Sequence, residues 1–346
     1  MSGKFQLEII PNTLHFKHPA GTSRGIYRTR QSWFLKLTSP DTPGQEGWGE
    51  CAPLPDLSCD ALPGEYEKIL EKHCRDFEKT GKINYEALRP YPSMLFGIET
   101  AMLHFHAGSY RLFDTAFSRG EQGITINGLV WMGNYEEMLL RMKEKLSDGF
   151  HCIKIKIGAI DFEQEIKLLE LIREQFSSKD VELRVDANCA FSPDEVEEKL
   201  NRLANFELHS IEQPIKAGLW KEMAKLCQET PVPIALDEEL IGVNDVEMKK
   251  KLLDTISPHY IVLKPSLHGG LKGTKEWMNE ANKRSIGSWV TSALESNIGL
   301  NAIAQWTAHY YKDSIPCAQG LGTGKLFSDN IKLPLCIKGD KLWYKE

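Results

Sequence analysis

The chain has 346 residues, of which 41% are hydrophobic and 26% are charged, so it can bury a sizeable core and is neither disordered nor fibrous. The formal charge of −6, without long runs of like charge, argues against a nucleic-acid partner. No segment is apolar for long enough to cross a membrane, and the eight cysteines lack the spacing of a disulfide scaffold or a CxxC pair. We therefore expect a cytoplasmic protein that binds neither nucleic acid nor membrane.

The first third of the chain mixes strands with helices. Strands are expected over residues 5–16, 24–38 and 48–52, and helices over residues 63–77 and 92–105. This mixture is typical of an α+β module.

From residue 124 onward, short β-branched runs alternate with amphipathic stretches, which is typical of βα units with parallel strands. Eight strands are expected, over residues 124–130, 152–157, 181–185, 209–212, 233–236, 260–263, 286–290 and 316–319. Polar residues follow six of them at regular intervals, namely Lys156, Asp186, Glu212, Asp237, Lys264 and Ser292. Because a TIM barrel carries its chemistry at the C-terminal ends of its strands, this regularity favours a barrel. An open doubly wound sheet is the alternative, but it would need a Gly-rich dinucleotide loop that the sequence lacks.

Two lysines alternate with three isoleucines in the second expected strand, over residues 153–157. Successive side chains of a strand point to opposite faces, so the isoleucines would meet the outer helices while Lys154 and Lys156 point into the barrel. A half-exposed antiparallel strand with solvated lysines is the alternative. Charges inside a parallel sheet are costly unless they have a function.

Three acids follow consecutive apolar strands: Asp186, Glu212 and Asp237. Each alone is typical of a helix N-cap or a surface acid. Three at one edge of a barrel would repel one another unless a cation lies between them. Carboxylate oxygens suit Mg²⁺, with Mn²⁺ as a second hard cation, whereas zinc would call for His or Cys in the same register.

Lys264 ends the sixth expected strand and would lie across the barrel from Lys156. Together with one Mg²⁺, the two lysines outweigh the three acids by one charge, which favours a small anionic carboxylate as substrate. A lysine beside Mg²⁺ can remove a proton α to such a carboxylate, and the metal and the second lysine would stabilise the enediolate.

These motifs resemble the enolase superfamily, and within it the muconate-lactonizing subgroup. The matching segments are residues 46–55, 92–98, 154–158, 184–188, 211–214, 236–238, 262–266, 292–296 and 320–323. The resemblance implies an α/β fold with a modified TIM barrel of the (β/α)7β type and an N-terminal α+β capping domain. The domains would be residues 1–122 for the cap, 123–326 for the barrel with the active site, and 327–346 for a segment that returns to the cap.

The resemblance also implies a role for each site residue. It makes Asp186, Glu212 and Asp237 the metal ligands, Lys156 the acid–base residue, and Lys264 the cation on the opposite face of the enediolate. It places Lys154, Arg184, Asn188, Ser292 and Gly320 at the substrate, and the capping-domain loops 22–24 and 53–58 over the site.

Within the subgroup, the segments are most similar to the family that dehydrates 2-succinyl-6-hydroxy-2,4-cyclohexadiene-1-carboxylate to 2-succinylbenzoate in menaquinone biosynthesis, a lyase reaction. The alternative is a racemase of N-acylated amino acids or a dipeptide epimerase, in which Lys156 and Lys264 act as opposed bases. Relatives that epimerise dipeptides usually carry Asp-x-Asp where this chain has Gly320-Leu-Gly-Thr. A non-catalytic barrel would need no such clustered charges, and a Schiff-base aldolase would need no carboxylates. A homo-oligomer is compatible with the sequence.

Overall fold

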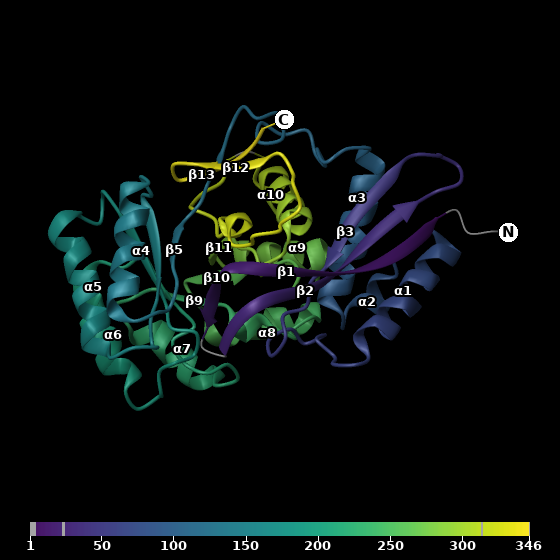
Figure 1. Ribbon diagram of the computed structural model, residues 1–346. Coiled ribbons are helices and arrows are strands. Elements are labelled where there is room, and N and C mark those ends of the chain that lie inside the picture. The colour runs from purple at the N-terminus through teal and green to yellow at the C-terminus, as the bar shows by residue number, and fades with distance from the viewer. Residues whose placement is uncertain (1–4, 23–24, 313, 346) are drawn as a thin grey trace.

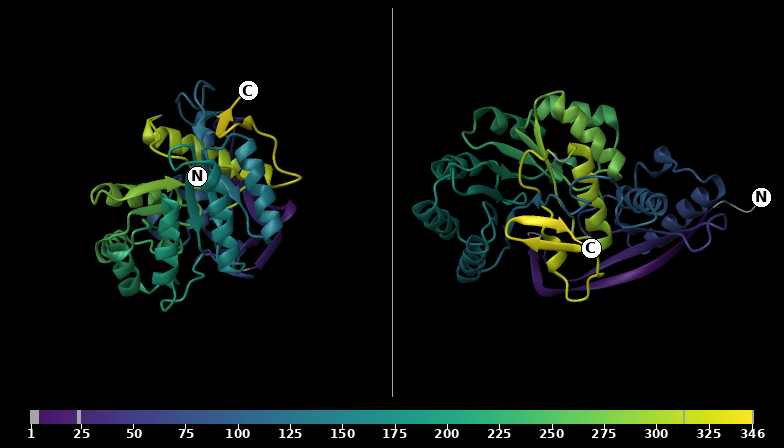
Figure 2. Two further views of the ribbon diagram at one scale, coloured as in Figure 1. Left: turned by 90° about the vertical axis from the view of Figure 1, so that its left-hand side faces the viewer. Right: turned by 90° about the horizontal axis from the view of Figure 1, so that it is seen from above.

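The computed structural model describes residues 5–22, 25–312 and 314–345. An N-terminal domain of strands and helices lies beside a parallel barrel that is surrounded by helices (Figure 1). Seen from above, the two parts lie at opposite ends of an elongated molecule and are joined by a long hairpin (Figure 2). The expected α/β fold with an N-terminal α+β domain is confirmed.

The N-terminal domain is built on an antiparallel sheet in the order β1 (Gln6–Thr22), β2 (Gly25–Thr38) and β3 (Glu46–Cys51). Its helices are α1 (Tyr66–Thr80), α2 (Tyr85–Leu88) and α3 (Pro92–Ala107). The helix α3 packs closely on β3, because a Cβ atom on Gly49 would lie only 2.0 Å from the carbonyl oxygen of Gly97. The domain has a hydrophobic core of its own, which includes Leu35, Leu70 and Ile98.

The strand β1 is longer than the sequence pattern predicts. Beyond residue 15 its pairing with β2 shifts register, and the hairpin continues toward the barrel (Figure 1). There Leu14 and Phe16 pack in a separate apolar cluster with Leu267 and Phe327. Contacts from the barrel therefore stabilise a part of the hairpin whose own sequence does not alternate clearly.

Seven parallel strands form the barrel sheet in chain order. They are β5 (Gly128–Val130), β6 (Cys152–Lys156), β7 (Glu182–Asp186), β8 (Ser210–Glu212), β9 (Ile234–Leu236), β10 (Tyr260–Leu263) and β11 (Gly287–Val290). Parallel bridges join Ile126 to Gln319 and Thr291 to Gly320, so the last segment connects the two edges. The expected barrel is confirmed, with its eighth strand reduced to these two bridging residues.

A helix follows each of these seven strands. They are α4 (Tyr135–Ser147), α5 (Phe162–Gln175), α6 (Val196–Leu203), α7 (Trp220–Glu229), α8 (Val246–Ile256), α9 (Gly270–Asn282) and α10 (Asn297–Tyr311). Short 3₁₀ turns occur at η1 (Ala204–Phe206), η2 (Glu238–Leu240) and η3 (Thr323–Lys325). The isoleucines of β6 are fully buried in the core between strands and helices. The predicted orientation of β6 is therefore correct, and it directs Lys154 and Lys156 to the inside of the barrel.

The residues after 326 contact both parts of the molecule. Phe327 bridges Phe16, and the Asp329 carboxylate accepts a hydrogen bond from the His15 backbone N–H at 2.8 Å. The hairpin of β12 (Leu335–Lys338) and β13 (Lys341–Tyr344) pairs instead with β4 (Ile124–Thr125). The strand expected over residues 124–130 is thus divided, because its first two residues pair with β13, Ile126 bridges Gln319, and its last three residues form β5 of the barrel sheet. The three-domain division at residues 122 and 326 stays a prediction.

Candidate active site

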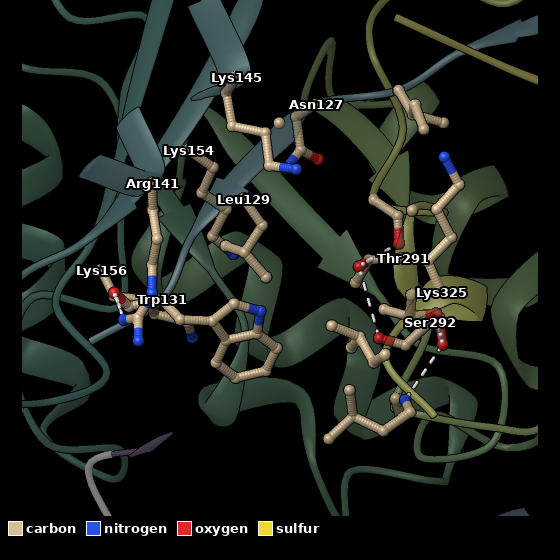
Figure 3. Close-up of a pocket in the computed structure, with 18 of the residues that line it drawn as sticks. Asn127, Leu129, Trp131, Arg141, Lys145, Lys154, Lys156, Thr291, Ser292 and Lys325 are labelled. Carbon is tan, nitrogen blue, oxygen red and sulfur yellow. Dashed lines mark hydrogen bonds between the residues drawn. The ribbon is translucent and has the colours of Figure 1, made fainter. Parts of the chain in front are cut away.

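A cavity of about 520 Å³ lies at the C-terminal ends of the barrel strands, next to the N-terminal domain. Its wall includes the side chains of Lys154 and Lys156 on one side and Thr291 and Ser292 on another (Figure 3). Lys264 also lines the cavity. The volume is typical of a small-molecule site.

The three predicted metal ligands come from neighbouring strands. Asp186 and Glu212 are the last residues of β7 and β8 and lie directly opposite each other in the sheet register, while Asp237 follows β9. All three side chains are almost completely buried. The regular βα repeat therefore brings together carboxylates that are 25 or 26 residues apart in sequence.

Each inward lysine is paired with at least one of these acids. The Lys154 Nζ lies 2.8 Å from Asp186 Oδ2 and 2.6 Å from Glu212 Oε2. The Lys156 Nζ lies 2.7 Å from Asp186 Oδ2, and Lys264 forms a close ion pair with Asp237. The lysines thus compensate the charge of the buried carboxylates.

These contacts shift the pKa of several groups. Burial lowers the pKa of Lys154, but the charges of Asp186 and Glu212 outweigh burial and raise it above its ordinary value. Burial also favours protonated Asp186, yet Lys154 and Lys156 hold the pKa of Asp186 well below its usual range. Burial and the neighbouring Asp186 charge raise the pKa of Glu212. The cluster therefore holds one carboxylate firmly ionised next to another that resists ionisation.

The carboxylates fit a hard divalent cation by their chemistry. Glu212 Oε1 and Asp237 Oδ1 are buried and have no hydrogen-bond partner among the described residues. Oxygen atoms of this kind are the ligands that Mg²⁺ prefers. Within residues 5–22, 25–312 and 314–345, no three His, Cys, Asp or Glu side chains have a ready metal-binding geometry, because lysine ammonium groups occupy the space between the acids.

Among the residues predicted to touch the substrate, Lys154, Asn188, Ser292 and Gly320 line the cavity. Asn188 Oδ1 accepts a hydrogen bond from the Lys156 Nζ at 2.7 Å. The Ser292 hydroxyl donates to Glu295 Oε2 at 2.5 Å and accepts from Thr323, so its hydrogen-bonding capacity is largely used within the protein. A Cβ atom on Gly320 would lie 2.0 Å from the Thr291 hydroxyl oxygen, which explains the glycine.

The predicted substrate contact of Arg184 is not supported. Arg184 is 1% exposed and does not line the cavity. It donates to Glu182 Oε1 at 2.7 Å and to the Ala318 carbonyl at 3.0 Å, and its guanidinium lies 4.3 Å from the centroid of the Trp289 ring. Arg184 is therefore a packed, ion-paired group inside the barrel. Its sequence position, two residues before Asp186, indicates the direction of its side chain but not these partners.

Both capping-domain loops were predicted to border the site. Leu54 and Leu57 of the loop 53–58 line the cavity. Of the loop 22–24, Thr22 ends β1, and residues 23 and 24 lie outside the described residues.

The family model described as enolase C-terminal domain-like matches residues 137–323. The chain belongs to the enolase superfamily. An o-succinylbenzoate synthase of Desulfotalea psychrophila is 42% identical to it over 99% of both chains. The crystal structure of MenC from the same organism superposes with a TM-score of 0.80 at 38% identity, covering 99% of this chain and 100% of that one. The L-Ala-D/L-Glu epimerase from Bacillus subtilis has a TM-score of 0.82 at 21% identity, covering 99% of this chain and 96% of that one, and shares the fold alone.

This enolase-superfamily chain is an enzyme, and its full-length relatives confirm the expected lyase class. None of the helices within the described residues combines the length and the apolar character needed to span a bilayer.

The sequence analysis missed several residues that line the cavity, namely Trp131, Arg141, Lys145 and Lys325. The Arg141 guanidinium donates to the carbonyl groups of Trp131 and Met132 at 3.0 and 2.9 Å, so α4 supports the loop after β5. Trp131 directly follows β5, so its place at a strand end was a signal that the sequence offered. Arg141, Lys145 and Lys325 follow no strand-end pattern, and only the packing of α4 and η3 on the barrel brings these three to the cavity.

Proposed function

We propose that this enzyme is an Mg²⁺-dependent o-succinylbenzoate synthase of menaquinone biosynthesis. It would eliminate water from 2-succinyl-6-hydroxy-2,4-cyclohexadiene-1-carboxylate and release 2-succinylbenzoate. The observation that carries the proposal is the 42% identity with the Desulfotalea psychrophila synthase over the whole chain. The cluster of facing lysines and carboxylates around the cavity supports it.

In the proposed reaction, Lys156 removes the proton α to the substrate carboxylate and then returns it to the departing hydroxyl group, which leaves as water. Asp186 and Asn188 accept hydrogen bonds from the Lys156 Nζ and so orient the amine at the cavity wall. Lys264 extends from β10, four strands away in the sheet, and supplies positive charge to the other face of the enediolate.

Asp186, Glu212 and Asp237 would hold the divalent cation, with Mn²⁺ as a substitute for Mg²⁺. When bound, the ion would neutralise the charge that proton removal builds on the substrate carboxylate. The ammonium groups that now pair with these acids would then be available to the anionic substrate.

A racemase of N-acylated amino acids or a dipeptide epimerase is the second candidate. The observation that favours it is the pair of lysines on β6 and β10, because each could serve one enantiomer. An L-Ala-D/L-amino acid epimerase of a Maribacter strain is 24% identical over 87% of this chain.

The deciding experiment assays the purified protein with Mg²⁺ against the cyclohexadiene substrate and both enantiomers of N-succinyl amino acids. For a synthase, Lys156→Ala should lose about 10²–10⁴-fold in dehydration rate, since general acid–base catalysis contributes this much. Lys264→Arg keeps the positive charge and should keep measurable dehydration. A wild-type protein that racemises rapidly but does not dehydrate, or full dehydration by Lys156→Ala, would contradict the assignment.

We further propose a small anionic carboxylate as the substrate, no nucleic-acid or membrane partner, and the cytoplasm as the location. All eight cysteines are free, which supports a reducing compartment. A homo-oligomer remains compatible with this function.

A further inference from the structure

Among the cations that line the cavity, two sets of lysines differ in their partners. Lys154, Lys156 and Lys264 are ion-paired with buried acids. Lys145 of α4 and Lys325 of η3 line the same cavity, but neither has an ion-pair or hydrogen-bond partner in the part of the chain that the structure describes. Two unpaired ammonium groups on one cavity are suited to bind an anion.

Lys145 lies next to the edge strand β5, and Lys325 follows the segment that bridges this edge of the sheet. On the side away from β6, β5 itself pairs with no strand among the described residues, and Ile126, two residues before β5, bridges Gln319. The cavity lining continues from here to Ile337 and Gly339, in and beside the β12–β13 hairpin. This part of the cavity therefore lies between β5 and the loop that carries Lys325.

The backbone between β5 and the Lys325 loop brings polar groups of the cavity wall together. The Asn127 N–H donates to the Gln319 carbonyl at 3.0 Å, and a Cβ atom on Gly322 would lie 3.8 Å from the Asn127 carbonyl oxygen. A Cβ atom on Gly128 would lie 3.1 Å from the Lys145 Cβ, so this glycine leaves room for the lysine. In Figure 3, Lys145 reaches toward Asn127 while Lys325 extends from the opposite wall.

The immediate surroundings favour a charged ligand over internal pairing. Asn127 is buried, and its side-chain amide has no partner among the described residues. The Lys145 Nζ lies 5.3 Å from the centroid of the Phe150 ring, which positions its stem. Glu144 and Asp148 also line the cavity, yet neither forms an ion pair with Lys145 or Lys325 within the described ranges.

We propose that Lys145, Lys325 and Asn127 form a second anion site, which binds the distal carboxylate of a dicarboxylate substrate. This inference rests on the proposed function. In that function, the ring carboxylate of the substrate lies at the cluster of acids and lysines, and the succinyl tail ends in a second carboxylate. The two ammonium groups attract the tail carboxylate, and the amide N–H group of Asn127 donates to it. The site selects for a second negative charge without taking part in proton transfer.

The test compares binding of 2-succinylbenzoate with binding of its analogue in which the tail carboxylate is a primary amide, by calorimetry on the Mg²⁺-loaded full chain. The wild-type protein should bind the diacid about tenfold or more tightly, because a charge-assisted hydrogen bond is worth at least this much. The variant Lys145→Met/Lys325→Met should lose most of this preference. Its KM should rise about tenfold while kcat changes little.

The matched control is Lys143→Met, which removes the same charge from the exposed side of α4, away from the cavity. It should keep the preference and the KM. Asn127→Asp provides a second test that keeps both lysines, and it should weaken binding of the diacid more than binding of the amide.

The outcomes separate the two hypotheses. If the wild-type protein dehydrates the substrate and prefers the diacid, but the double variant keeps that preference, the second anion site is wrong and the proposed function stands. If Lys143→Met reduces the preference for the diacid as strongly as the double variant, the lysines act only through the net charge of the protein. The proposed second anion site is then wrong as well. If the wild-type protein neither dehydrates the substrate nor binds the product, the proposed function fails and the site loses its ligand.

Discussion

Lys154 lies between two carboxylates that were both expected to bind metal, and this contact explains how the protein tolerates a buried acid cluster. The Asp186 and Glu212 side chains are 0% and 2% exposed. An unpaired carboxylate at such a position would be very costly, whereas the ammonium group contacts both of them and compensates one negative charge. Lysine and metal therefore compete for the same carboxylates, and metal binding would release the lysine for substrate.

Replacing one ligand by its amide tests this arrangement. Asp186→Asn, Glu212→Gln and Asp237→Asn should each weaken Mg²⁺ binding by about tenfold or more and nearly abolish turnover, because each removes a charged oxygen donor. Calorimetric titration with Mg²⁺ measures the first effect. The metal-free Glu212→Gln protein should unfold at the same or a higher temperature, since burial and Asp186 already disfavour its charge.

The control for these variants is Glu222→Gln, an exposed acid on α7. It should keep the affinity for Mg²⁺ and the activity. Wild-type Mg²⁺ affinity in all three ligand variants would disprove the metal assignment.

At the scale of elements, one side chain of β2, that of Arg30, hydrogen-bonds both to the start of the loop 53–58 and to the barrel. The buried Arg30 guanidinium donates to the carbonyl groups of Ala52 and Pro53 at 2.5 and 2.6 Å. It also donates to the carbonyl of Leu294 at 3.1 Å, in the loop after β11. Both loops line the cavity, so a residue outside the cavity determines how its two walls meet.

Arg30→Met should therefore affect both stability and substrate binding. Arg30 is a cation close to the buried acids Glu50 and Glu295, and its loss should lower the free energy of unfolding by about 3–5 kcal/mol, the scale found when the cation that compensates a buried charge is removed. KM should rise, because the two loops are no longer tied together. Denaturant unfolding and steady-state kinetics measure these effects.

A second variant separates the two effects. Arg30→Met/Glu295→Gln removes one uncompensated charge and should recover part of the stability, while KM stays high. Recovery of both would mean that Arg30 acts on stability alone.

At the scale of the whole molecule, carboxylates of the N-terminal domain hold the first turns of two barrel helices. Glu50 of β3 accepts from the Ser296 and Gly299 N–H groups at the start of α10, both at 3.0 Å. Glu99 of α3 accepts from the Leu271 and Lys272 N–H groups of α9 at 2.6 and 3.1 Å. The first N–H groups of a helix have no partner within their own helix, so these carboxyl oxygens satisfy them and orient the N-terminal domain on the barrel.

The Glu99 contact makes stability depend on pH. Burial raises the pKa of the Glu99 carboxyl from 4.5 to about 8. The folded state therefore keeps a proton that the unfolded state loses, and this contribution to stability is full below pH 4.5 and declines until about pH 8. Glu99→Gln cannot ionise, so the fall in melting temperature across this window should be smaller than in the wild-type protein. Calorimetry at intervals of about one pH unit between about pH 5 and 9 measures the melting temperature of both proteins. An equal fall in melting temperature in both would contradict this role.

The sequence alone determined the barrel and the residues at its strand ends. The repeat of polar residues after apolar strands follows from the parallel sheet itself, because every strand ends at the same edge. Residues such as Asp186, Glu212 and Lys264 were therefore predictable without coordinates, and so was the inward direction of Lys154 and Lys156.

Only the tertiary structure decided which side chains reach the cavity from elsewhere and which do not. Arg184 shares the inward face of β7 with Asp186, yet it is occupied by Glu182 and Trp289. Lys145 and Lys325 reach the cavity from the helix α4 and the turn η3, and neither lies at a strand-end position of the βα repeat. The physical reason is that a strand's periodicity sets only the direction of a side chain, whereas its partners depend on packing between segments that are distant in sequence.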